Sequence, residues 1–294
     1  GWKMLMECLS VGRGISLPAS ANASSKMTTY CIYNYSKHRK QFNMPLIKME
    51  GIQNKLVDMV YNTWLIHCSV DLTNHLLDKG EQPAIISAIM KQQTTDRARN
   101  IINNGVDIYG GSAICLGKNN FIEKYHRLTP IGITVEGSNV LTRNLIIYGQ
   151  GLNKSHPYIY KLYDSIVNNN IYDFKINFNL IAKDMVLKYF SALFSFNVSY
   201  LQKQTILFSC LNNFIAILGG EIKKNQSISS DMADILSNLY LAYSVEFNQM
   251  NDKTSKELSD YCIDRLIHEN NIIINRVIDN YPSKLKYLLK LLQI

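Results

Sequence analysis

One long amphipathic stretch, residues 51–79, limits what this chain can fold into. Its apolar residues recur at alternating steps of four and three, which is the spacing of one face of an α-helix. The members of this stripe are Ile52, Leu56, Met59, Ile66 and Val70, with Thr63 and Thr73 in the gaps. Gly80 follows at the position where a helix end favours glycine. This stretch is the strongest helix prediction in the chain.

Three further segments before residue 105 show helical periodicity, and with residues 51–79 they predict an up-down four-helix bundle. Their expected bounds are residues 1–18, 21–42 and 82–105. Pro18 and the Met44-Pro45 pair mark expected breaks, because proline removes a helical hydrogen bond, whereas Pro83 suits a first helical position. We expect Gly105 to close the fourth helix.

The second half of the chain is predicted to form another helical domain. Helical patterns recur after a stretch rich in Tyr and Asn, near residues 180–201, 205–224, 229–249 and 256–279. We therefore expect an all-α fold with domains 1–150 and 151–294, and a boundary near residues 149–156. The chain begins with Gly1 rather than Met and ends inside an apolar run, residues 285–294, so we expect a piece of a longer polypeptide.

The net charge indicates the kind of partner, and the cysteines indicate the location of the protein and whether it binds a metal. A formal net charge of +8 suits an anionic partner such as a nucleotide-bearing cofactor, an acidic lipid surface or nucleic acid. No basic block with interleaved aromatic residues stands out, so we expect no nucleic-acid partner. The 6 cysteines are widely spaced, without a C-x-x-C pair or a histidine at ligand spacing, which predicts reduced thiols, a cytoplasmic location and no metal site. No apolar window approaches the roughly 18 residues that a membrane span requires.

Residues 130–151 place one carboxylate, Glu136, between an apolar run and an expected helix start. Apolar and small residues alternate over 131–135, so we expect an extended, half-buried approach. Gly137 and Ser138 then supply a turn and a helix N-cap. Loss of water at an apolar bend raises the pKa of a carboxyl group and makes it a better base toward a carbon acid. From these residues alone, a surface glutamate in a connecting segment is the alternative.

Four short motifs, in order and spacing, carry a resemblance to a known family. They are LSVGRG (residues 9–14), RKQFNMP (39–45), DIYGG (107–111) and VEGS (135–138). Together they resemble the C-terminal half of acyl-CoA dehydrogenases over about residues 1–150. Residues 213–247 are similar to the extra helical C-terminal domain of the bacterial fatty-acid-degradation (FadE-type) branch.

The resemblance implies a role for each matching residue. Glu136 would remove the α-proton of an acyl-CoA while the β-hydrogen leaves as hydride to FAD, giving a trans-2-enoyl-CoA. Arg13 and Gly137 would contact this substrate. Arg39 and Phe42 would hold the FAD pyrophosphate and adenine across a dimer interface, since a guanidinium can bind phosphate through two hydrogen bonds. The other residues that would contact the cofactor are Asp107, Gly110, Gly111 and Ser138.

Some matching positions differ from the family pattern. Asn43 stands where glycine is usual, Asp107 where glutamine is usual, Ala113 where a further glycine often follows, and Ser138 where threonine is usual. Asp107 matters most, because a carboxylate near a pyrophosphate is unfavourable unless it bonds a ribose hydroxyl or a backbone amide.

The resemblance also implies partners. They are FAD, a medium to long acyl-CoA, an electron-transfer flavoprotein or similar acceptor, and further copies of the chain in a dimer or tetramer. The family's N-terminal helical domain and flavin-covering β-domain are not in this sequence, and a separate polypeptide could supply them. We therefore expect the isolated chain to oligomerise without retaining FAD or activity, either in the cytoplasm or peripherally at the inner membrane. A split or decayed gene product with only a dimerisation role, and a helical scaffold for acidic partners, are the alternatives.

Overall fold

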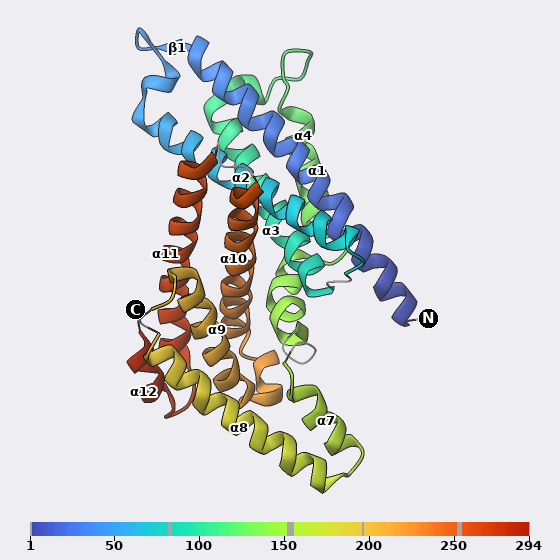
Figure 1. Cartoon of the computed structure of the whole chain (residues 1–294). Helices are drawn as coiled ribbons and strands as arrows, with labels where there is room; N and C mark the ends of the chain where they lie inside the picture. The colour runs from blue at the N-terminus through green and yellow to red at the C-terminus, as the bar shows by residue number, and fades with distance from the viewer. Residues whose placement is uncertain (1, 82–83, 152–155, 196, 252–254, 294) are drawn as a thin grey trace. The chain divides into compact units, whose positions relative to one another are not determined.

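The computed structural model of the chain describes residues 2–81, 84–151, 156–195, 197–251 and 255–293 (Figure 1). It confirms the all-α prediction: the only strands among these residues are β1 (Lys40–Gln41) and β2 (Met44–Pro45). The chain forms two compact units, one of Gly1–Asn139 with Tyr243–Cys262 and one of Val140–Ala242 with Ile263–Ile294. The domains 1–150 and 151–294 stay a prediction.

Unit 1 is a helical bundle built on three long helices. They are α1 (Trp2–His38), α2 (Glu50–Asp78) and α3 (Ala84–Tyr109), with the short 3-10 helix η1 (Leu46–Lys48) before α2. α1 packs on α2 and α3, α2 packs on α3, and α4 (Glu123–Thr134) packs on α3. The strongest prediction, a helix over residues 51–79, is confirmed to within one residue at each end. Its residues Met59, Leu65 and Ile66 are fully buried in the bundle.

The N-terminal helix is continuous, so the predicted break at Pro18 is wrong. Pro18 lies inside α1 and is buried. A proline lacks one backbone hydrogen bond, and here packing of α1 against α2 and α3 compensates for that loss. The fourth helix of the bundle is therefore α4 and not a separate segment 21–42. Pro83, predicted as a first helical residue, lies outside the described residues.

Gly105 does not end α3, which continues to Tyr109. It is instead a point of close packing, because a Cβ atom there would lie 2.9 Å from Thr28 Cγ2 and 2.9 Å from Ile122 Cδ1. A residue without a side chain lets α1 approach α3 at this level. The sequence signal for a helix end was in fact a signal for a helix contact.

The approach to Glu136 is helical, so the predicted extended segment 131–135 is wrong apart from Val135 itself. Half-buried residues recur along α4 at helical spacing, as Tyr125, Thr129, Gly132 and Ile133. Pro130 lies inside α4 and cannot donate to the carbonyl of His126. The hydroxyl of Thr129 donates to that carbonyl instead, at 2.9 Å. The neighbouring side chain thus satisfies the acceptor that proline leaves free.

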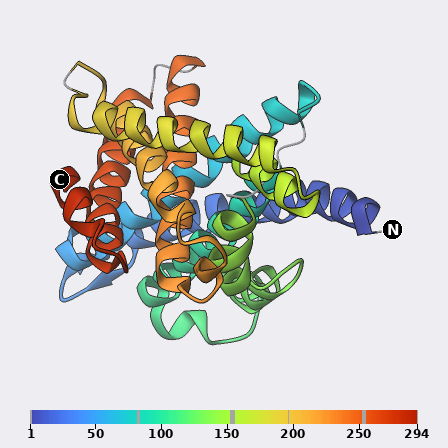
Figure 2. The ribbon, with the colours of Figure 1, turned by 90° about the horizontal axis from the view of Figure 1, so that it is seen from below.

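Unit 2 begins within the short α5 (Asn139–Leu141) and continues through a π-helix, η3 (Thr142–Gln150). Its further elements are α7 (Ile159–Val167), α8 (Ile171–Leu193), α9 (Tyr200–Ala216), η4 (Gly219–Lys223), α10 (Gln226–Asn251), α11 (Lys256–Asn280), α12 (Lys286–Leu289) and η6 (Lys290–Leu292). The C-terminal end of α10 and the start of α11 belong to unit 1. α8 packs on α7 and α9 (Figure 2). The helix predicted over 180–201 is two helices, because Ser199 forms a capping box that starts α9.

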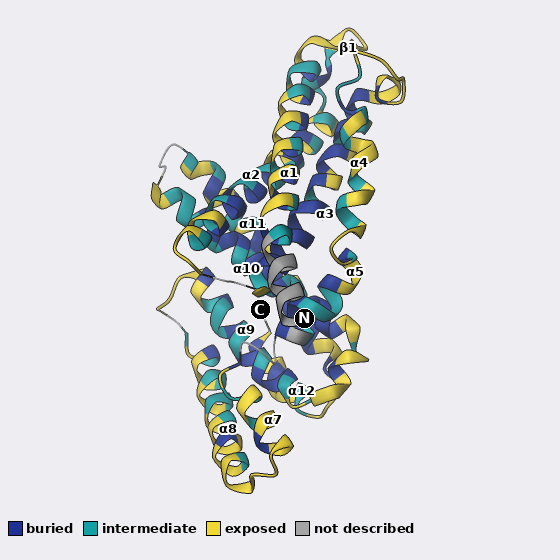
Figure 3. Ribbon diagram, turned by 90° about the vertical axis from the view of Figure 1, so that its right-hand side faces the viewer, coloured by how far each residue is buried: buried dark blue, intermediate teal, exposed yellow. Residues whose placement is uncertain are grey.

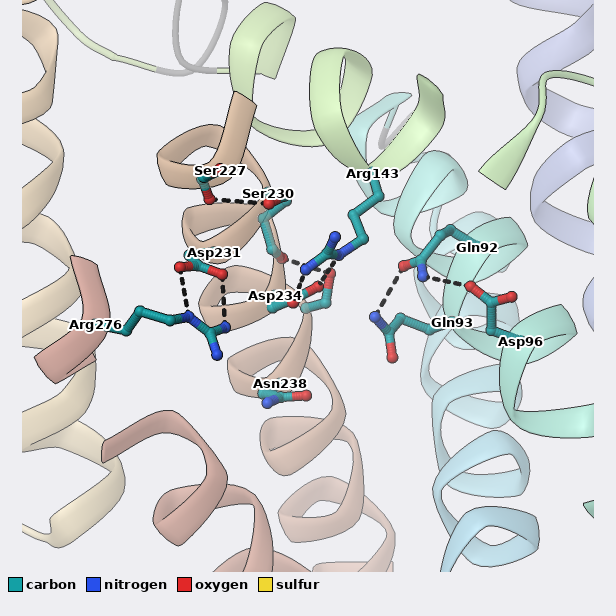
Figure 4. A network of polar contacts seen from close by, with 12 residues as sticks. Gln92, Gln93, Asp96, Arg143, Ser227, Ser230, Asp231, Asp234, Asn238 and Arg276 are labelled. Atoms are coloured by element: carbon teal, nitrogen blue, oxygen red, sulfur yellow. Dashed lines mark hydrogen bonds and ion pairs between the residues drawn. The ribbon is translucent and has the colours of Figure 1, made fainter. Parts of the chain in front are cut away.

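Two ion pairs fix η3 and α11 to α10 within unit 2 (Figure 4). Arg143 Nε donates to Asp234 at 2.7 Å, and Arg276 Nε donates to Asp231 at 2.7 Å. Each guanidinium makes a second bond to its carboxylate, so both pairs are bidentate. The hydrogen-bonded carboxylate raises the pKa of each guanidinium.

Candidate active site

Glu136 stands in the short connection between α4 and α5, at a left-handed turn. Its φ is 53°, and φ of the following Gly137 is 98°. A non-glycine residue in this region costs on the order of 1–3 kcal/mol and persists where the surroundings hold it there. The connection begins at Val135, whose N–H closes α4 on Ile131 O at 3.0 Å. Glu136 is exposed, and so can meet a ligand.

Arg13 and Gly12 of α1 lie beside Glu136. A Cβ atom on Gly12 would lie 3.7 Å from Glu136 Oε1, so the carboxylate rests against the backbone of α1. Burial lowers the pKa of Arg13, and the charge of Glu136 partly offsets this. Among the described residues, Arg13 Nε is buried and has no hydrogen-bond partner. A buried donor without an acceptor suits a site that a polar ligand completes.

Lys91 of α3 lies beneath the Glu136 turn, and the sequence reading missed it. The residue is 0% exposed, yet its Nζ donates to Gly137 O at 2.6 Å, Asn139 Oδ1 at 2.6 Å and Ile133 O at 3.1 Å. Burial lowers the pKa of Lys91 to about 8; Asp96 and Glu136 raise it, and Arg13 lowers it further. A lysine on the buried stripe of a predicted helix is the signal that could have found it.

Asn139, at the start of α5, links the turn to α3 a second time. Its Nδ2 donates to Thr95 Oγ1 at 2.9 Å, while its Oδ1 accepts from Lys91. Thr95 also meets Gly132, where a Cβ atom would lie 3.3 Å from Thr95 Cγ2. Ser138, one residue before Asn139, is half-buried in the same connection. The structure thus brings Arg13, Glu136, Gly137 and Ser138 together at one end of the bundle.

Arg39 and Phe42 lie at the other end of α1, beyond its last residue. The predicted helix over residues 21–42 does not reach them, because α1 ends at His38 and Phe42 lies in the two-residue turn between β1 and β2. Phe42 and Asn43 have φ of 50° and 64°, as this hairpin turn requires. Asparagine tolerates a left-handed conformation, which accounts for Asn43 where the family has glycine. Phe42 is unusual there, and its ring is 88% exposed.

Gly110 and Gly111 follow α3 at the same end as the hairpin. The rings of Tyr35 on α1 and Tyr109 on α3 pack edge to face at 4.7 Å, which joins the two helix ends. Gly110 has φ of 63°, and an added Cβ would meet nothing within 4 Å at Gly110 or Gly111. The backbone is therefore open to a neighbour or a ligand.

Asp107 is paired with a cation. Lys55 of α2 donates to Asp107 Oδ2 at 2.7 Å and to Asn104 Oδ1 at 3.1 Å. The ion pair offsets the negative charge that made Asp107 unfavourable near a pyrophosphate.

The sequence-predicted residues therefore form two groups along α1, one beside Arg13 in the first half of the helix and one beyond its last residue, His38. Arg13 and His38 are 25 residues apart on this helix, which places the two groups about 38 Å apart at 1.5 Å per residue. The first group holds Glu136 and the second holds Arg39, so one copy of the chain cannot bring both to the same small region.

Both halves of the chain match known protein families. Residues 1–150 match the family described as acyl-CoA dehydrogenase, C-terminal domain, and residues 198–294 match acyl-CoA dehydrogenase, C-terminal, bacterial type. The mitochondrial short-chain specific acyl-CoA dehydrogenase of Sus scrofa is 29% identical over 150 residues, which is 51% of this chain and 35% of that protein. An acyl-CoA dehydrogenase of Bacillus subtilis is 29% identical over 150 residues, which is 50% of this chain and 38% of that protein.

A solved structure resembles the chain over nearly its whole length. It is a crystal structure of an acyl-CoA dehydrogenase complexed with FAD from Bacillus anthracis, with a TM-score of 0.75 and 19% identity. The likeness covers 99% of this chain and 53% of that one, and at this identity it shows the fold alone.

The bundle and its sequence match define the class: residues 1–150 form a C-terminal helical domain of the acyl-CoA dehydrogenase type. The chain belongs to the acyl-CoA dehydrogenase family. It spans 35% and 38% of the two curated relatives named above. Among the described residues, no helix combines the length and apolarity of a membrane span, and no group of acidic, His and Cys side chains could hold a metal ion.

Proposed function

We propose that the chain is the C-terminal half of a FAD-dependent acyl-CoA dehydrogenase in which Glu136 is the catalytic base. The observation that carries this proposal is the exposed carboxylate at a left-handed turn beside Arg13, whose buried Nε has no partner among the described residues. An acyl-CoA of medium to long chain, as in the fatty-acid-degradation branch, is the proposed substrate.

The residues of the Glu136 group would have distinct roles. Glu136 would take the α-proton of the acyl-CoA, and Arg13, which lies beside Glu136, and Gly137 would contact the substrate. When bound, FAD supplies the acceptor for the β-hydrogen and its two electrons, which leaves a trans-2-enoyl-CoA.

The hairpin end of the bundle suits the cofactor's nucleotide part. Arg39 and Phe42 are exposed there and can bind phosphate and stack on a ring, and Gly110 and Gly111 leave the backbone accessible. Ser138, in the Glu136 group, would contact the other part of the cofactor. Because about 38 Å separates the two groups along α1, the hairpin of one copy would serve the flavin bound to another copy. This supports a dimer or tetramer as the working assembly, with an electron-transfer flavoprotein or similar acceptor as its partner.

The role of Glu136 is tested by Glu136→Gln in the chain supplied with flavin-covering domains. The substitution keeps the shape and removes the base, so kcat should fall by about two to four orders of magnitude while acyl-CoA binding is largely kept. Glu123→Gln is the matched control, because Glu123 lies at the start of α4, where it pairs with Arg127. Near-normal turnover of Glu136→Gln would contradict the proposed role of Glu136 as the base.

The isolated chain should bind FAD weakly and lack dehydrogenase activity. The flavin ring would have no covering domain, and phosphate contacts through exposed Arg39 are weak and screened by salt. The test is a visible spectrum and a dye-reduction assay with a long-chain acyl-CoA, before and after adding a matching N-terminal polypeptide. Yellow, active protein without that addition would contradict the proposal that the active site needs other domains.

A second candidate function is an oligomerisation or scaffold module, favoured by the apolar surface of α7 and α8. Large apolar residues are exposed along these two helices, among them Tyr163, Tyr172, Phe178 and Phe190. Figure 3 colours much of α7 and α8 as exposed. Exposed apolar patches of this kind mark association sites. Light scattering of the chain tests it: Phe178→Ser with Phe190→Ser should reduce self-association, and Phe174→Ser, on the same helix but less exposed, should have the smaller effect.

A further inference from the structure

The three atoms that accept hydrogen bonds from Lys91 lie on both sides of Glu136. Ile133 O is three residues before the carboxylate, Gly137 O is one residue after it, and Asn139 Oδ1 is three residues after it. An ammonium group has three donors, so a charged Lys91 satisfies all three acceptors and has no donor left over. One buried side chain thus joins the end of α4, the left-handed turn and the start of α5.

The turn needs such support for two reasons. Ile133 O is one of the last carbonyls of α4 and has no partner within that helix, as for every helix end. Glu136 also holds a backbone conformation that an L-residue adopts only when its surroundings impose it. The second link, from Asn139 to Thr95, fixes the side-chain amide that accepts from Lys91.

We propose that Lys91 is a positioning residue for Glu136: by holding the backbone on both sides of the turn, it keeps the carboxylate in one orientation toward the substrate. This inference rests on the proposed role of Glu136 as the base. Lys91 itself is 0% exposed, so it would act through the turn and not by contact with the substrate. A displacement of about 1 Å at a reacting group can lower turnover a hundredfold, which is the scale of effect expected here.

The first test needs neither flavin nor activity. Lys91→Met keeps most of the volume and removes all three donors, so hydrogen exchange of the amides in residues 133–139 should become at least tenfold faster in the isolated chain. Lys55→Met is the matched control, because Lys55 bonds Asn104 and Asp107 and does not touch the turn. Asn139→Ala is a second variant in case Lys91→Met does not fold, and it should speed exchange in the same residues. Unchanged exchange at 133–139 in a folded Lys91→Met chain would overturn the proposal.

The second test uses the chain joined to its flavin-covering domains. Lys91→Met should lower kcat by tenfold to a hundredfold with little change in acyl-CoA binding, whereas a general loss of structure would change both. Because Lys91 acts through Glu136, adding Lys91→Met to Glu136→Gln should lower the residual rate no further. If Lys91→Met reduces the rate as much in Glu136→Gln as in the parent, Lys91 does not act through the base. If the parent itself is inactive, the proposed function fails. The exchange experiment still tests whether Lys91 holds the turn at residues 133–139.

Discussion

Gly105→Ala should destabilise unit 1, although alanine is the better helix former. The added Cβ would lie 2.9 Å from Thr28 Cγ2 and from Ile122 Cδ1, and 3.3 Å from Ile32 Cγ1. These three residues are fully buried, and the β-branched Thr28 has few rotamers into which its methyl group can move. Overpacking costs about 1–3 kcal/mol and alanine regains about 1 kcal/mol in a helix, so we expect a net loss of about 1 kcal/mol.

Urea unfolding followed by circular dichroism at the helix band measures this loss. Gly51→Ala is the matched control, because Gly51 lies in α2 and an added Cβ there meets nothing within 4 Å. Thr28→Ser removes the obstructing Cγ2, so it should restore part of the stability when combined with Gly105→Ala. Gly51→Ala should unfold at the same or a higher urea concentration than the parent. The reasoning is refuted if Gly105→Ala does so too.

Three further outcomes follow from named contacts. Arg39→Ala should weaken FAD retention by the assembled enzyme, while the melting temperature of flavin-free protein stays within a degree or two. The reason is that exposed charges contribute little to folding. A sharp fall in melting temperature would instead show that Arg39 has a structural role. Arg276→Met should cost about 2 kcal/mol in urea unfolding, because the Asp231 side chain is only 7% exposed and loses its bidentate partner. Arg265→Met is the control, because the side chain of its partner Glu269 is 35% exposed. Burial lowers the pKa of Lys91 from 10.5 to about 8, so between these pH values the unfolded chain binds more protons and this group's contribution to stability rises with pH. Relative to Lys91→Met, the unfolding free energy of the parent should therefore rise by about 2 kcal/mol from pH 7 to pH 9.5, and a flat difference would contradict the lowered pKa.

The periodic helices were predictable, because a stripe of apolar residues at steps of three and four needs no knowledge of the rest of the chain. The helix over residues 51–79 shows this, as its end signals agree with its periodicity. Proline and glycine misled the prediction at Pro18 and Gly105. Each has a local preference that tertiary contacts override: packing of α1 at Pro18 and close approach at Gly105. The alternation over residues 131–135 misled it as well, because α4 continues through most of that segment.

The candidate site was only partly predictable. The VEGS motif placed Glu136 in a turn, and the structure gives that turn its left-handed conformation. Lys91 escaped notice because its importance depends on a contact 46 residues along the chain, to Gly137 O, and no local pattern encodes such a contact. The pairing of Lys55 with Asp107 was not predicted for the same reason, because the two residues are 52 positions apart in the sequence.

Because α1 is unbroken, the number of residues in it sets the distance between Glu136 and the hairpin. Inserting one residue into α1 between Arg13 and His38 would turn the hairpin by about 100° around the helix axis relative to Glu136 and shift it by about 1.5 Å. Inserting four residues would nearly restore the direction but move the hairpin about 6 Å further away. If Arg39 and Phe42 serve another copy of the chain, evolution can replace side chains along α1 freely on its exposed face, yet it cannot easily change the number of residues between its two ends.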